Sequence, residues 1–185
     1  MIIFIINNLN IKNNKKMQGE TKEETKGETY QIETMQCSIQ LNTTFTHTLS
    51  NIGFDYLPQD VVNNIMKDGR VFSHLIEKWI SLEYPLEHIE GCQAYDFIDG
   101  NFPETKYDEK TFTKNGCKFC PSNMLGQGRV FDREIFEEKT KKLIFCIVSN
   151  VNFPIIKIRF VRGIELLQRY QNGIIPFREH DDFFT

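Results

Sequence analysis

Residues 95–100 read Tyr-Asp-Phe-Ile-Asp-Gly, and residues 106–113 read Lys-Tyr-Asp-Glu-Lys-Thr-Phe-Thr. The first run is short and apolar, and the second is rich in aromatic and β-branched residues, as strands are. Between them, residues 99–103 read Asp-Gly-Asn-Phe-Pro and supply turn chemistry. The two runs therefore predict a β-hairpin in the middle of the chain.

Each arm of this hairpin carries an acid. Because side chains alternate between the two faces of a strand, Asp108 and Lys110 would point to one side and Glu109 to the other. Asp96 on the first arm could reach the side of Asp108. Two carboxylates and an ammonium at one strand pair are suited to Mg²⁺-dependent phosphodiester hydrolysis, since Mg²⁺ prefers oxygen ligands and a cation steadies the developing charge.

Length and composition predict one domain with a polar N-terminal segment. The chain has 185 residues, of which 40% are hydrophobic and 12% aromatic, enough for a core. Residues 1–45 are dominated by Asn, Lys, Glu and Thr, so we expect them to be disordered or poorly ordered, with the domain at residues 46–185.

The cysteine count and the apolar segments bear on the compartment. Five cysteines, an odd number, and an apolar start of only a few residues favour a cytoplasmic protein with reduced thiols. No apolar stretch approaches the length of a membrane span, so no membrane partner is expected.

The net charge of −3 is unevenly distributed. Residues 106–169 contain 13 basic and 7 acidic residues, a net charge of +6. A basic half around an acidic centre is typical of an enzyme that acts on a nucleic acid, although a modest patch of this kind is equally typical of an ordinary solvated surface.

Helix and strand patterns surround the hairpin. Apolar residues at helical spacing over residues 61–80, interrupted at Asp68-Gly69, predict a helix pair or one kinked helix. Residues 131–142 predict an amphipathic helix, and residues 143–149 a buried strand parallel to the Asp108 arm. Residues 156–162 alternate and predict a half-exposed antiparallel strand with a basic face.

A glutamate on the first predicted helix and a long loop after the hairpin add candidate residues. Glu77 could be a further catalytic residue or metal ligand, or a surface side chain paired with Lys78 or Arg70. The loop at residues 114–129 is longer than most connections and contains polar side chains suited to phosphates and base edges. The candidate DNA-binding residues are Lys114, Lys118, Ser122, Asn123, Gln127 and Arg129.

A zinc site is a separate hypothesis. Cys117 and Cys120 form a Cys-x-x-Cys pair, and His88 and Cys92 lie upstream at a spacing that could complete four ligands. The alternative is two ordinary thiols in a loop.

The order helix, strand, strand, helix, strand, with acids on the first two strands, resembles the PD-(D/E)xK nucleases, which include type II restriction endonucleases. Asp96 matches the first acid, and Asp108-Glu109-Lys110 stands for the (D/E)xK half, although no proline precedes Asp96. Asp99 competes with Asp96, but Asp99-Gly100 is explained by turn chemistry. The resemblance implies an α/β fold with a restriction-endonuclease-like core, a mixed β-sheet of about four to five strands flanked by helices.

The resemblance also implies a mechanism and partners. Asp96 and Asp108 would hold Mg²⁺ with the carbonyl of Glu109, and Lys110 would orient the attacking water. The substrate would be double-stranded DNA, cut by a homodimer at a palindromic site. Two other classes stay open, namely a nucleic-acid-binding protein of the same fold without catalysis and a small zinc-binding module.

Overall fold

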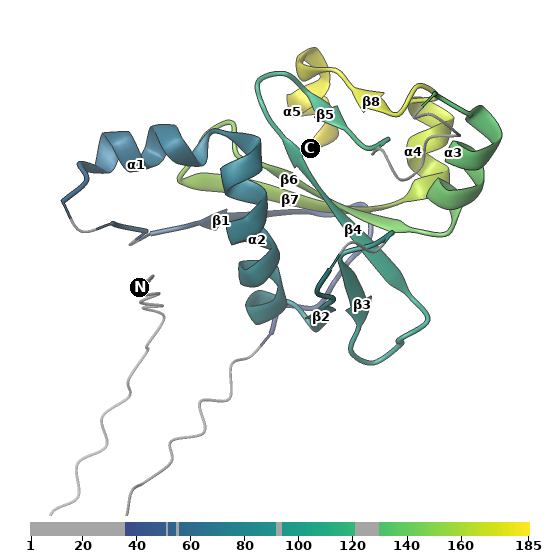
Figure 1. Cartoon of the computed structure of the whole chain (residues 1–185), viewed down its shortest axis with the longest axis horizontal. Helices are drawn as coiled ribbons and strands as arrows, with labels where there is room; N and C mark the ends of the chain where they lie inside the picture. Colours follow the sequence, from purple (N-terminus) through teal and green to yellow (C-terminus); the bar gives the residue numbers. More distant parts are fainter. Residues whose placement is uncertain (1–35, 51, 55, 92–93, 121–129) are drawn as a thin grey trace, which may run out of the picture.

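The computed structural model describes residues 36–50, 52–54, 56–91, 94–120 and 130–185 (Figure 1). Over these ranges no helix combines the length and the hydropathy that a membrane crossing needs. The elements are β1 (Thr44–Thr48), α1 (Gln59–Met66), α2 (Gly69–Glu83), β2 (Leu86–His88), β3 (Phe97–Asp99), β4 (Lys106–Phe112), β5 (Cys117–Lys118), α3 (Arg133–Lys141), β6 (Ile144–Ser149), β7 (Ile155–Arg162), α4 (Gly163–Arg169), β8 (Ile174–Ile175), a 3₁₀ turn η3 (Phe177–Glu179) and α5 (His180–Phe183).

Six strands form the main sheet in the order β1-β7-β6-β4-β3-β2, and β5 pairs with β8 beside it. Strands β4 and β6 are parallel, as predicted, and the other neighbours in the main sheet are antiparallel. The mixed α/β class is confirmed. The expected count of four to five strands was too low, because β1 lies across the boundary expected at residues 45 and 46 and β2 has only three residues, and both are held by pairing with β7 and β3.

Helices cover both faces of the sheet and bury two separate cores (Figure 1). On one face α1 contributes Val62 and α2 contributes Phe72. On the other face α3, α4 and α5 contribute Phe136, Leu166 and Phe183 respectively. Strand β6 supplies alternate residues to the two cores, so it is buried on both faces, as its continuous apolar run predicts.

The ordered domain begins before residue 46. Phe45 on β1 packs edge-on against Tyr84 and Phe160, with ring centroids 5.8 and 6.2 Å apart, and Leu41 forms a bridge with Phe160. Thr44 and Phe45, which precede the boundary expected at residues 45 and 46, therefore belong to the main sheet through pairing with β7. The expectation for residues 1–35 lies outside the described residues.

Strand β7 is antiparallel to its neighbours and alternates as predicted, with Ile156, Ile158 and Phe160 buried, but part of its basic face is covered. It lies between β1 and β6, and Arg159 is covered by the C-terminal segment. The Arg159 guanidinium lies over the Phe183 ring and donates a hydrogen bond to the Phe183 carbonyl oxygen. This cation therefore anchors the C-terminus instead of forming an open basic face.

The close approach of α3 and α4 depends on Gly163. A Cβ at this position would overlap the Thr140 carbonyl oxygen, a backbone atom that cannot move aside by itself. We predict that Gly163→Ala lowers the free energy of unfolding by about 3 kcal/mol in urea denaturation. Gly53→Ala is the matched control, because no heavy atom lies within 4 Å of its Cβ position. Equal stability of the two variants would contradict the packing described.

Candidate functional site

The candidate site lies beside β4 at the point where β3 begins. Phe97 pairs with Tyr107, so Asp96, the residue before β3, faces Asp108 across the hairpin. The Asp96 amide donates to the Tyr107 carbonyl at 2.9 Å. Its carboxylate Oδ2 accepts the Glu109 amide at 2.7 Å, which satisfies a backbone donor that no described strand pairs. Asp96 therefore stands at the edge of the sheet, within reach of both faces.

One face of β4 carries Asp108 and Lys110, as strand alternation predicts. Asp108 is only 4% exposed, and its Oδ2 lies 2.8 Å from Lys110 Nζ without hydrogen-bond geometry. The same ammonium donates to the Glu109 carbonyl oxygen at 2.5 Å. Lys110 thus contacts two of the oxygen atoms that the predicted metal site would use.

Burial disfavours the charged forms of the acid and the lysine in this cluster. Burial raises the pKa of Asp108 to about 7; Lys110 opposes the shift, and Asp96, close enough to hydrogen-bond, adds to it. Burial disfavours the charged form of Lys110, but Asp108 and Asp96 outweigh it and the pKa of Lys110 is raised. Two carboxyl groups in contact share one buried ammonium, which leaves this cluster short of positive charge.

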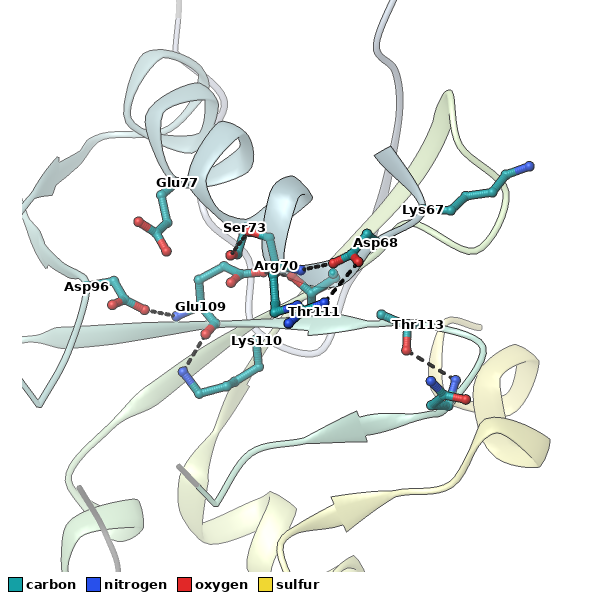
Figure 2. Close-up of a pocket in the computed structure, with 12 residues that line it drawn as sticks. Lys67, Asp68, Arg70, Ser73, Glu77, Asp96, Glu109, Lys110, Thr111 and Thr113 are labelled. Carbon is teal, nitrogen blue, oxygen red and sulfur yellow. Dashed lines mark hydrogen bonds and ion pairs between the residues drawn. The ribbon is translucent and has the colours of Figure 1, made fainter. Parts of the chain in front are cut away.

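The other face of β4 lines a pocket of about 580 Å³ under α2 (Figure 2). Glu109 points into it from β4 and Glu77 from α2, while Asp96 lines it from the sheet edge. Thr111 Oγ1 donates to Glu109 Oε1 at 3.0 Å. Burial raises the pKa of Glu109 to about 8; Lys110 and the Thr111 hydrogen bond oppose the shift, and Asp96 and Glu77 add to it.

Glu77 is paired, but with neither of the two expected partners. Its Oε2 lies 3.3 Å from His88 Nε2, whereas Lys78 Nζ lies 3.5 Å from Glu90. The structure places Glu77 on the pocket wall opposite Glu109, away from the face of Asp108. A role for Glu77 would therefore be exerted through the pocket.

The competition between Asp96 and Asp99 has a geometric answer. Asp99 Oδ1 accepts the Asn101 and Phe102 amides at 2.8 and 3.1 Å, and Oδ2 accepts the Tyr107 hydroxyl at 3.1 Å. Both oxygens of Asp99 therefore serve the hairpin turn. Asp96 is the acid that meets the β4 cluster.

The predicted DNA-binding residues are described only in part. Lys114 and Lys118 are exposed, on the turn after β4 and on β5. The remaining four, Ser122, Asn123, Gln127 and Arg129, lie outside the described residues.

The zinc hypothesis finds little geometric support. His88 packs against Phe97 in the core under α2, whereas Cys117 and Cys120 belong to the core on the opposite face of the sheet. Cys92 lies outside the described residues. Over the described ranges, no three His, Cys, Asp or Glu side chains converge on a point where they could hold a metal ion.

Several pocket residues were missed by the sequence reasoning. Lys67 and Arg70 flank the start of α2, and Thr111, Thr113 and Asn115 follow one face of β4. The threonines share the two-residue spacing of Glu109, a signal that was present in the sequence. No sequence pattern indicated that the start of α2 would lie over them.

No protein-family model, no curated protein and no solved structure matches this chain.

The raised pKa values of Asp108 and Glu109 predict how stability depends on pH without metal. Between about pH 4 and pH 8 the folded state keeps protons that the unfolded state has lost, so stability falls as pH rises through this window. Each unit of pKa difference contributes about 1.4 kcal/mol. Urea denaturation from pH 4 to 9 should show this decline, flattening above pH 8.

Asp108→Asn provides the control for this prediction, because asparagine has a similar shape and does not titrate. The decline should become shallower in this variant. An unchanged pH dependence would show that Asp108 is not buried as described.

Proposed function

We propose that this protein is a Mg²⁺-dependent endonuclease that cleaves double-stranded DNA, related in design to type II restriction enzymes. The observation that carries the proposal is that Asp96, Asp108 and Lys110 come together on β4, next to the start of β3. Buried carboxyl groups that are short of compensating positive charge are a frequent property of metal-dependent active sites.

The donor atoms suit Mg²⁺. Asp96 and Asp108 offer carboxylate oxygens, Asp108 Oδ2 is buried without a hydrogen bond, and the Glu109 carbonyl lies at the same edge. Mg²⁺ is commonly held by one or two carboxylates together with water and substrate phosphate, so three carboxylates are not required. These groups would hold the ion, which lowers the pKa of bound water and polarises a phosphoryl oxygen.

The chain's own residues have distinct roles in this proposal. Asp96 also fixes the Glu109 amide, which keeps the Glu109 carbonyl aimed at the sheet edge. Lys110 Nζ lies 2.8 Å from Asp108 Oδ2 and balances its charge. If a cation neutralised that carboxylate, the ammonium would be free to orient the attacking water and to stabilise the negative charge on the phosphoryl oxygens.

The arrangement of elements supports the same reading. Along the chain α2, β3, β4, α3 and β6 keep the expected order of helix, strand, strand, helix, strand, with the short strands β2 before β3 and β5 after β4 added to it. The parallel pairing of β4 and β6, with α3 between them in sequence, agrees with the core that the resemblance implies. We therefore keep the restriction-endonuclease-like core as part of the proposal.

The proposed partners are duplex DNA and a second copy of the chain. A palindromic site has two-fold symmetry, which a homodimer matches with one cluster for each strand. The exposed Lys114 and Lys118 are candidates for contacts with the duplex. A cytoplasmic location would give such an enzyme access to DNA.

Substitution of the cluster tests the proposal. We predict that Asp108→Ala and Lys110→Ala each reduce Mg²⁺-dependent cleavage of phage DNA by at least about 100-fold, because each removes a ligand or proton-handling group. Discrete bands on a gel after incubation with wild-type protein are the readout, with circular dichroism confirming the fold of each variant.

Asp99→Asn is the matched control, since its turn hydrogen bonds can be kept by an asparagine. It should cleave at the wild-type rate. Cleavage retained in both Asp108→Ala and Lys110→Ala would exclude the proposed site. Binding of DNA by the wild-type protein without cleavage in Mg²⁺ would favour the non-catalytic alternative.

A further inference from the structure

The pocket under α2 has two ends of opposite character. Glu77, Asp96 and Glu109 line one end, and Lys67, Asp68 and Arg70 line the other, where the Lys67 side chain extends away from the other labelled residues (Figure 2). We propose that the cationic end binds the phosphate backbone of duplex DNA next to the cleavage point. This inference rests on the proposed function for its choice of ligand, but it concerns residues outside the catalytic cluster.

The start of α2 contributes to this end of the pocket. α2 has 15 residues, and its N-terminal amides carry a partial positive charge that favours an anion. Gly69 lets the helix lie directly on β4, since a Cβ there would come within 2.9 Å of Thr113 Cγ2. The positive end of the helix is thus brought to the pocket wall, where Arg70 adds a cationic side chain.

Arg70 is available to a ligand. Its side chain is 93% exposed, and its contact with Asp68 is long, at 3.4 Å between Nη2 and Oδ2. An exposed ion pair of this kind contributes little, so exchanging it for a phosphate has a small cost. Arginine is well suited to phosphate, because its guanidinium can donate two parallel hydrogen bonds.

Polar side chains connect the two ends. Thr111 and Thr113 follow Glu109 at two-residue spacing along β4, and Asn115 lies just beyond. Four residues of strand from Glu109 to Thr113 span about 13 Å. Because one DNA strand advances about 3.4 Å along the helix axis per nucleotide, this length can accept more than one phosphate group.

Asp68 opposes the proposed ligand. Its carboxylate lines the same end of the pocket, caps the Arg70 amide at 2.9 Å and holds the Arg70 side chain. Removing this charge while keeping the cap should therefore strengthen DNA binding. Asparagine does both, because it caps helices as well as aspartate does.

The test measures binding to a phage-derived duplex in Mg²⁺, with every full-length protein carrying Lys110→Met to prevent cleavage. We predict that Arg70→Ala weakens binding about tenfold, as expected for loss of a charge-assisted hydrogen bond. The slope of log affinity against log salt should become shallower by about 0.9, one phosphate contact. Lys67→Ala should act in the same direction, and Asp68→Asn should tighten binding.

Matched controls remove the same charges elsewhere. Arg162→Ala replaces an arginine that also pairs with a nearby acid, at 3.1 Å from Glu165, and Lys78→Ala replaces a lysine of α2 outside the pocket. Both variants should leave the affinity for DNA within about twofold of the parent, because each removes only a surface ion pair that contributes little free energy.

Two failures can be told apart. The inference is overturned if the parent does not bind the duplex, or if Arg70→Ala and Asp68→Asn bind it as the parent does, even when the wild-type protein cleaves DNA. The proposed function fails instead if the wild-type protein never cleaves DNA in Mg²⁺, while the opposite shifts of the Arg70 and Asp68 variants would still support this binding site.

Discussion

The structure of the site depends on one hydrogen bond, from the Glu109 amide to the Asp96 carboxylate. β3 begins at Phe97 and therefore does not pair with the part of β4 that contains Glu109. A buried backbone donor without a partner would be costly. Asp96 supplies the partner and is thereby fixed at the edge of the sheet beside Asp108. The end of the pairing between β3 and β4 thus leaves the space beside β4 open and positions Asp96 in it.

β4 serves two environments at once. One face presents Asp108 and Lys110, and the other presents Glu109 and Thr111 to the pocket under α2. Asp96 couples the two faces electrostatically, because it raises the pKa of Asp108 on one face and of Glu109 on the other. A cation bound at this edge would relieve the acids on both faces, which links metal binding to the charge state of the pocket.

The two proposals divide this region by its chemistry. At the acidic end, buried carboxyl groups around Lys110 suit a hard cation and an activated water. At the other end, Lys67, Arg70 and the start of α2 suit a phosphate backbone. A polyanion whose cleavage needs a divalent cation would make use of both ends, which is why we propose duplex DNA as the ligand of the whole pocket.

The sequence by itself determined the hairpin, the helix pair, the buried strand β6 and the face shared by Asp108 and Lys110, because these follow from local periodicity and turn chemistry. Tertiary structure alone decided the pairing of β1 and β2, the covering of Arg159 by Phe183 and the placement of Gly69 beside Thr111 and Thr113. It also assigned Asp99 to the turn and Asp96 to the site. These outcomes depend on contacts between distant segments, which no local pattern encodes.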